Sequence, residues 1–165
     1  AGNIDVSRVY ELSWDGKVWV WTDKTPATNP PPRLKTAMAY DATAAKMVLF
    51  GGERLDVPGT HYSDTWTWNG TVWAQLAPAT GPSSRSSMAM VYHPASGKIV
   101  AFGGSDISNR NDTWQLTTAT STWAEQTFTL GVPPTRSLAG LVYHEARNSL
   151  VLFGGGTDTA VWESD

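Results

Sequence analysis

Short runs of β-branched and aromatic residues alternate with polar positions along the chain, and Gly, Pro, Asn and Asp bound each run. Such runs are typical of short β-strands separated by turns. Asp15-Gly16 and Asn69-Gly70 each stand between two apolar runs, and these dipeptides favour two-residue hairpin turns. No segment keeps a helical period of apolar residues. The pattern therefore predicts an all-β chain of antiparallel hairpins.

The same pattern returns three times, at spacings of 52 and 51 residues. Each copy begins at an Arg, runs to a Tyr and continues into an apolar segment that closes on two glycines. The arginines are Arg33, Arg85 and Arg136, and each lies 18 residues before its first glycine. The glycine pairs are Gly51-Gly52, Gly103-Gly104 and Gly154-Gly155. The constant spacing indicates one rigid unit, since an insertion would shift the strand register.

Each repeat predicts four antiparallel strands, which in the first copy span residues 33–40, 46–50, 64–68 and 71–76. Four strands in a period of about 50 residues are typical of a propeller blade. The segment 9–23 matches the second half of a repeat, and 158–162 begins the third strand of another. In the first of these matches Trp14, Gly16 and Trp19 occupy the positions of Trp68, Gly70 and Trp73.

The paired glycines after an apolar strand, the Tyr eleven residues before the first of them, and the spaced tryptophans resemble the Kelch motif. The resemblance covers residues 9–162, with Leu12 and Ala160 standing where the other copies have the first Trp. It implies an all-β, Kelch-type β-propeller of three blade-equivalents, each of four antiparallel strands. The expected single domain spans 1–165, with a half-blade at 9–23, blades at 33–76 and 85–127, and an incomplete blade at 136–163.

Residue sizes indicate how the strands are placed. The first strand of each repeat carries a small residue midway, at Ala37, Ala89 and Gly140. This strand is therefore expected to be innermost, where converging blades leave little room. The second strand ends at Phe50, Phe102 and Phe153, which are expected in the core with the tryptophans between blades. The glycine pairs are expected to adopt positive φ or to allow a close backbone approach.

Composition narrows the class of function. The length of 165 residues suits one domain, and 41% apolar with 16% charged residues is typical of a globular protein. A net charge of -3 without a run of Lys or Arg offers no basic surface to nucleic acid or an anionic membrane. The apolar runs are far shorter than the ~18 residues of a membrane helix. The absence of cysteine excludes disulfides and thiolate metal sites, and leaves the compartment open, cytoplasmic or secreted.

The loops between the second and third strands vary most among the repeats, and function concentrates on such loops. The candidate ligand-binding residues there are Glu53, Arg54, Asp56, His61 and Tyr62 in the first repeat, and Asp106, Asn109 and Arg110 in the second.

Three arginines, Arg33, Arg85 and Arg136, are expected at the same face of the propeller, around the mouth of its channel. Guanidinium groups there could bind a carboxylate or phosphate. The resemblance to Kelch domains that bind acidic peptides implies such an anionic ligand site. The alternative is structural, with each Arg holding blade-to-blade hydrogen bonds or pairing with the Asp before the third strand.

Metal and catalytic chemistry find little support in the sequence. His93 and His144 share a turn position with Asp41, where hydrogen bonding within the turn explains them better than coordination. His61 lies in an acidic loop whose irregular spacing predicts a solvated segment rather than an oxygen-ligand site. The galactose-oxidase-like Kelch enzymes need a cysteine-crosslinked tyrosine, and this chain has no cysteine. We expect no catalytic residue, metal ligand or cofactor.

The sequence thus predicts a non-catalytic binding scaffold with its ligand on the loop face, first a protein or peptide and second a sugar or small anion. The alternative is a fragment or engineered half of a larger propeller. That larger propeller could be a carbohydrate-active enzyme or another propeller enzyme whose active site needs the missing blades. Glu53 and Asp106 on adjacent blades could supply a carboxylate pair for glycoside hydrolysis.

Assembly follows from counting strands, because closed propellers need roughly four to eight blades and the repeats supply three blade-equivalents. Two copies are expected to close a six-bladed ring as a homodimer, with 9–23 of one copy completing the blade that begins at Arg136 in the other. An open ring would leave an unpaired strand edge. Residues 9–13 and 159–163 both match a third strand, so one of them is displaced or added at the seam.

Overall fold

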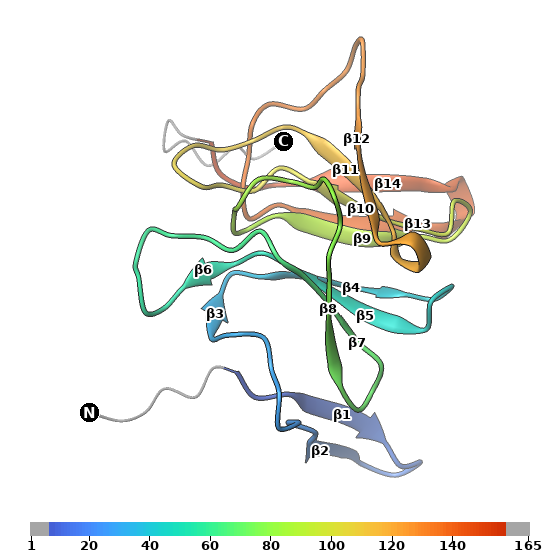
Figure 1. The fold of residues 1–165 in the computed structure, drawn as a ribbon. Coiled ribbons are helices and arrows are strands. Elements are labelled where there is room, and N and C mark those ends of the chain that lie inside the picture. Colours follow the sequence, from blue (N-terminus) through green and yellow to red (C-terminus); the bar gives the residue numbers. More distant parts are fainter. Residues whose placement is uncertain (1–6, 158–165) are drawn as a thin grey trace.

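The computed structural model describes residues 7–157, and these form antiparallel sheets stacked beside one another (Figure 1). Blade 1 is a four-stranded sheet in the order β4 (Ala37–Asp41), β5 (Lys46–Phe50), β7 (Thr65–Trp68) and β8 (Trp73–Leu76). Blade 2 repeats this order with β9 (Ala89–His93), β10 (Lys98–Phe102), β11 (Thr113–Thr117) and β12 (Thr122–Gln126). The all-β, antiparallel prediction is confirmed.

Two further hairpins flank these blades. β1 (Tyr10–Trp14) pairs with β2 (Trp19–Asp23), and β13 (Gly140–His144) pairs with β14 (Ser149–Phe153), each as a two-stranded sheet. The helical segments of the described chain are the 3-10 turns η1 (Thr118–Thr120) and η2 (Glu145–Arg147), and neither could cross a membrane. The strand expected at 158–162 lies outside the described residues.

The first strand of each repeat is innermost, as the small residues predict. β4 lies beside β9, and β9 lies beside β13, so these strands line the side on which the sheets converge. Ala37 and Ala89 are buried at this contact. The outer strands β8 and β12 follow at the opposite edge of each blade.

The expected first strand at 33–40 is wrong in one respect, because the structure breaks it. β3 (Arg33–Leu34) leaves the blade and pairs with β6 (Glu53–Arg54), and β4 begins only at Ala37. The break falls at Lys35, whose φ is +52°, and Ser87 and Leu138 adopt the same left-handed conformation in the later copies. Because the break is repeated in all three copies, each arginine precedes the first strand of its blade and lies against the glycine pair.

The third and fourth strands of blade 1 begin one and two residues later than expected, at Thr65 and Trp73. Asn69 explains the later start, since its side-chain oxygen accepts hydrogen bonds from the amides of Thr71 and Val72 at 3.0 and 2.9 Å. These two residues therefore belong to an Asx turn rather than to β8.

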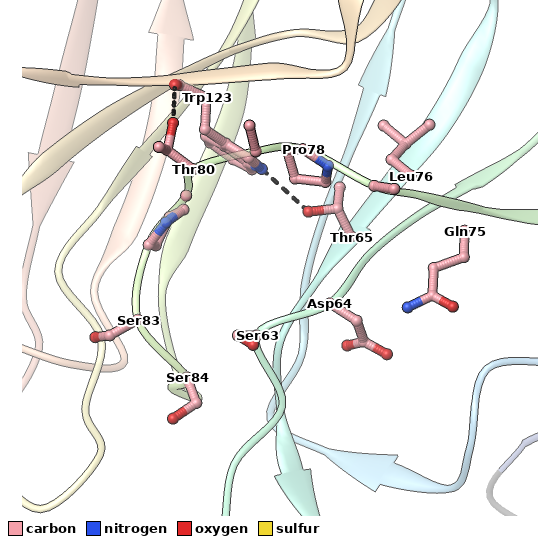
Figure 2. Close-up of a pocket in the computed structure, with 14 residues that line it drawn as sticks. Ser63, Asp64, Thr65, Gln75, Leu76, Pro78, Thr80, Ser83, Ser84 and Trp123 are labelled. Carbon is pink, nitrogen blue, oxygen red and sulfur yellow. Dashed lines mark hydrogen bonds between the residues drawn. The ribbon is translucent and has the colours of Figure 1, made fainter.

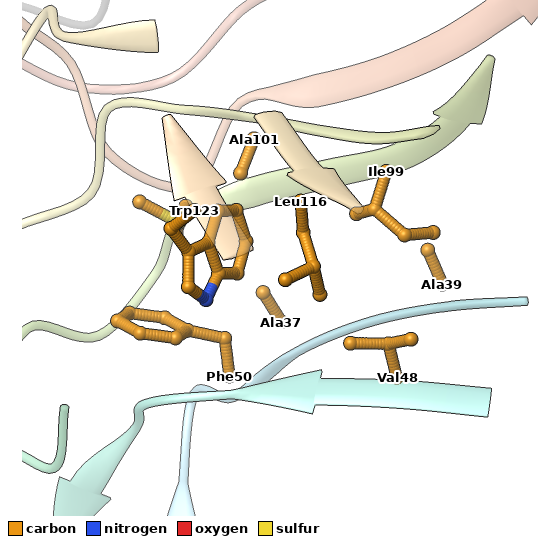
Figure 3. Packing of buried hydrophobic residues seen from close by; sticks show 9 residues of the cluster. Ala37, Ala39, Val48, Phe50, Ile99, Ala101, Leu116 and Trp123 are labelled. Atoms are coloured by element: carbon orange, nitrogen blue, oxygen red, sulfur yellow. The ribbon is translucent and has the colours of Figure 1, made fainter. Parts of the chain in front are cut away.

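The core lies between blade 1 and blade 2 (Figure 3). Trp123 on β12 is 2% exposed, and its ring meets that of Phe50 edge-to-face at a centroid distance of 5.6 Å. The Trp123 Nε1 donates a hydrogen bond of 3.0 Å to Thr65 Oγ1, which anchors β12 of blade 2 on β7 of blade 1. Val48, Ile99 and Leu116 complete the contact and are fully buried.

Several aromatic residues expected in the core are exposed in the described chain. Phe50 and Phe102 are buried, whereas Phe153 at the end of β14 is 64% exposed. Trp14 and Trp19 on the β1–β2 hairpin are 53% and 64% exposed. These side chains lie on the two-stranded sheets β1–β2 and β13–β14, which flank the two four-stranded blades in the described chain.

Candidate ligand-binding face

The three repeated arginines are buried in the frame of the structure. The Arg85 guanidinium donates to the Gly103 carbonyl at 3.1 Å and to Asp112 Oδ1 at 2.5 Å. The other oxygen of Asp112 accepts a bond of 2.8 Å from Trp114 Nε1. An arginine, an aspartate and a tryptophan thus form one network that joins the glycine turn to β11.

The first repeat builds the same network. Arg33 donates to both carboxylate oxygens of Asp64, at 2.6 and 2.8 Å, and to the Gly51 carbonyl at 3.0 Å. Trp66 Nε1 donates to Asp64 Oδ2 at 2.7 Å. Arg136 makes the corresponding contact with the Gly154 carbonyl at 3.1 Å. Recurrence in every copy favours the structural role that the sequence left as an alternative.

Electrostatics supports these pairs. Burial raises the pKa of Asp64, but hydrogen bonds from Arg33 and Trp66 and the charge of Arg33 outweigh it and hold that pKa below its ordinary value. Asp112 follows the same balance, with burial opposed by Arg85 and Trp114, and its pKa is also lowered. Both carboxylates are therefore ionised partners of the buried arginines.

Backbone hydrogen bonds at the glycine pairs join neighbouring blades. The Gly52 amide donates to the Arg85 carbonyl at 2.9 Å, and the Gly104 amide donates to the Arg136 carbonyl at 3.0 Å. All six glycines of the three pairs have positive φ, as expected from the sequence. Each arginine therefore ties its own blade together through its side chain, and Arg85 and Arg136 also bind the preceding blade through their carbonyl groups.

Tyr62 gathers several of the candidate ligand residues on the loop face. The Arg33 guanidinium carbon lies 4.0 Å from the centre of its ring, and that of Arg54 lies 5.5 Å away. Arg54 also pairs with Asp56, at 3.1 and 2.7 Å. We call the cavity here, of about 640 Å³, the Tyr62 pocket. It is lined by Pro31, Pro32, Arg54, Leu55, Asp56 and Tyr62.

The remaining candidates are held within their own loops. Asp106 pairs with Arg110 at 2.7 Å and accepts the amides of Ile107 and Ser108. Burial raises the pKa of Asp106, but these hydrogen bonds outweigh burial and lower that pKa to about 2. The Asn109 side chain donates to the Gly156 carbonyl at 2.9 Å.

Glu53 and His61 pair through their backbones in the first loop, and Glu53 accepts a bond of 2.8 Å from Lys35. The structure therefore does not bring the second-repeat candidates into the Tyr62 pocket, and Glu53 and His61 do not line it.

The structure also has a polar groove on this face, which the sequence pattern did not predict (Figure 2). Its volume is about 670 Å³, and it lies between the start of β7 and the loop that leads from β8 toward blade 2. Ser63, Ser83 and Ser84 surround the hollow, with Gln75 and Thr80 nearby (Figure 2). Ser63 precedes Asp64, and the adjacent Ser83 and Ser84 precede Arg85, so the groove joins two segments whose proximity the sequence pattern does not reveal. We call this cavity the serine groove.

The histidines take up turn and loop contacts. His93 Nδ1 lies 2.9 Å from Ser96 Oγ, and the His93 ring packs against Tyr143 at 5.4 Å. Asp41, at the corresponding position of the first repeat, accepts the amides of Thr43 and Ala44. Among residues 7–157, no three metal-ligating side chains are grouped closely enough to hold a metal ion.

Comparisons with known proteins agree with this architecture. The family model described as the KLHDC2/KLHL20/DRC7 Kelch-repeats domain matches residues 3–164. The solved structure of YjhT is similar to this chain with a TM-score of 0.67 at 17% sequence identity. The similarity covers 94% of this chain and 48% of YjhT, so the chain spans about half the length of that protein. At that identity YjhT shows a shared fold alone, whereas the family match covers nearly all repeats. The chain belongs to the Kelch-repeat family.

Proposed function

We propose that this Kelch-repeat chain is a non-catalytic scaffold that binds a protein or peptide on its loop face. Kelch-repeat domains are typically binding scaffolds, so the family supports protein interaction as the broad function. The observation that carries the proposal is the Tyr62 pocket, where a large aromatic ring, a cation and an anion meet on a variable loop. A constant frame with variable loops is a common way to build a binding surface.

The repeated arginines are proposed as the support of this site rather than its main ligand contacts. Arg33 and Arg85 are buried and bonded to aspartates, so a ligand carboxylate would have to displace Asp64 or Asp112. Arg54 is accessible, with 38% of its side chain exposed, and its partner Asp56 is 65% exposed. Exposed ion pairs contribute little stability, so an incoming carboxylate can replace Asp56 at small cost.

The walls of the Tyr62 pocket suggest which peptides fit. Pro31, Pro32 and Leu55 provide apolar contact, and Tyr62 offers a rigid ring that loses little conformational entropy on binding. Arg54 can donate two parallel hydrogen bonds to one carboxylate. The proposed ligand is therefore a peptide with an acidic residue beside an apolar one.

We also propose that two copies of the chain close a six-bladed ring. The hairpin β1–β2 corresponds to the last two strands of a blade, and β13–β14 corresponds to the first two. Together they would supply the four strands of one blade, and both sheets carry exposed aromatic residues. The loop faces of both copies would then lie on one side of the ring.

The binding proposal is tested with peptides selected from a random library on the purified protein. Calorimetry then compares the affinity of a selected peptide for the wild type, Tyr62→Ala, Arg54→Ala and the control Tyr40→Ala, which lies beside the Asp41–Lys46 turn. We expect the first two variants to weaken binding at least about 10-fold, which is about 1.4 kcal/mol, and the control to leave it unchanged. Weaker binding by Tyr40→Ala alone, or no selected peptide, would contradict the proposal.

A further inference from the structure

The contact between blade 1 and blade 2 is organised around one tryptophan. Trp123 stands second in the fourth strand of blade 2 and inserts against blade 1, where it meets Phe50 and bonds to Thr65. Besides Phe50 and Thr65, Gly81 on the loop after β8 also lies against this tryptophan. A Cβ added at Gly81 would lie 3.8 Å from the Trp123 Cβ. We call this arrangement the tryptophan socket.

An apolar groove of about 210 Å³ lies one blade further on, and it has the same walls. Phe102 stands where blade 1 has Phe50, and Thr113 stands where it has Thr65. Val132 lies four residues before Arg136, as Gly81 lies four before Arg85. The groove is therefore the socket of blade 2. It is lined by Val100, Phe102, Thr113, Phe128, Gly131, Val132, Pro133, Leu141, Leu150 and Leu152.

No tryptophan of residues 7–157 occupies this second socket. Phe128 and Val132 at its rim are 57% and 39% exposed, while Phe102 is buried at 6%, as its equivalent Phe50 is at 1%. The β13–β14 sheet beside the groove has only two strands in the described chain, so the fourth strand that would carry the tryptophan has no counterpart there. The surface is apolar, and large exposed apolar surfaces mark interaction sites.

Trp19 matches the missing side chain. It follows the Asp15-Gly16 turn at the spacing at which Trp73 follows Asn69-Gly70, which makes it the Trp123 equivalent of the N-terminal hairpin. Trp19 is 64% exposed, and within residues 7–157 its hairpin β1–β2 forms a sheet of its own. The described part of the chain thus presents a socket that holds no tryptophan and, on another sheet, an exposed tryptophan of the matching repeat position.

We propose that Trp19 of a second copy inserts into the groove formed by Phe102, Thr113 and Val132, and that its Nε1 donates to Thr113 Oγ1. The inference rests on the proposed two-copy ring but not on the proposed peptide ligand. A second copy is the favoured occupant because tryptophan and groove obey one repeat spacing, so the contact is self-complementary. The two-fold symmetry forms this tryptophan contact twice in the ring. The same arrangement places the exposed Phe153 of one copy against Trp73 of the other.

Substitution of Trp19 tests the contact. Trp19→Ala should leave each copy folded, because the side chain is exposed, and should raise the dimer dissociation constant about 100-fold or more. The matched control is Trp21→Ala on the same strand, since the equivalent residues Gln75 and Glu125 are exposed. Sedimentation and circular dichroism measure mass and folding. A dimer that survives Trp19→Ala unchanged would overturn the inference, while the two-copy ring itself would stand.

Cross-linking gives a second test that does not depend on loss of affinity. The chain has no cysteine, and the occupied socket predicts a Cβ distance near the ~3.8 Å of disulfides between positions 19 and 132 of different copies. Trp19→Cys with Val132→Cys should give a covalent dimer on oxidation, and Trp21→Cys with Val132→Cys should not. A wild type that is monomeric throughout would overturn both the ring and the inference. A dimer without this cross-link would overturn the inference alone.

Discussion

The guanidinium group of Arg85 shows how single side chains hold the frame together. It lies almost fully buried, satisfies a glycine carbonyl and neutralises Asp112, which in turn accepts a bond from Trp114. A charge is stable in such a place only when it is paired and hydrogen-bonded. The arginine is therefore part of the repeat's architecture, and its position is repeated because the architecture is repeated.

We expect Arg85→Ala to lower the free energy of unfolding by about 3–5 kcal/mol, because it leaves Asp112 and the Gly103 carbonyl without their buried partner. The exposed Arg147 provides a matched control, and Arg147→Ala should change stability by no more than about 0.5 kcal/mol. Urea unfolding followed by tryptophan fluorescence measures both. Equal stability of the two variants would show that the buried network contributes nothing.

The sequence predicted the chemistry of individual residues unevenly. Arg33 and Asp64 are 31 residues apart, and Arg85 and Asp112 are 27 apart, so the pairing follows from strand packing and not from a constant spacing. Tyr62 was predicted as a candidate ligand-binding residue, but the position of its ring against Arg33 depends on where β3 pairs with β6. The serine groove escaped prediction for the same reason, because its walls come from separate segments.

At the scale of strands, alternating residues and turn signals predicted most of each blade. β5 falls where the pattern placed it, and both hairpins turn at their glycines, but the predicted two-residue turns are wrong because each loop has four residues, 15–18 and 69–72. The break ahead of β4 could not be seen, because Lys35 adopts a positive φ without being Gly or Asn. Tertiary hydrogen bonds impose that conformation: the Lys35 carbonyl accepts the amide of Ser87, which has the same conformation in the next blade.

The glycine turn after the second strand offers a test of packing between blades. A Cβ at Gly103 would lie 2.5 Å from the Arg136 carbonyl oxygen and 3.1 Å from that of Arg110, both backbone atoms. Gly70 also has a positive φ, but a Cβ added there would have no other atom within 4 Å. Both alanine variants carry the cost of that φ. Gly103→Ala should cost about 1–3 kcal/mol more in thermal or urea unfolding, since the close backbone contact must open. Equal costs would rule out a steric role for Gly103.

At the scale of the whole molecule, residues 7–157 form two four-stranded Kelch blades with a two-stranded sheet at each side. The contact between blade 1 and blade 2 is well packed around Trp123, whereas the β1–β2 and β13–β14 sheets expose Trp19 and Phe153. The repeat count predicted four-stranded antiparallel blades from the sequence, and blade 1 and blade 2 have this form. The seam of the proposed ring could not be predicted in detail, because residues 9–13 and 159–163 match the same strand, and the second of these segments lies outside the described residues.

The most direct test of the two-copy ring is the mass of the chain in solution, measured by sedimentation equilibrium over a range of concentrations. A closed two-copy ring predicts a folded species of twice the 17.9 kDa chain mass. Dilution should dissociate this dimer into monomers, in which Trp19 and the second socket are exposed to water. A well-folded species that remains at 17.9 kDa at every concentration would contradict it.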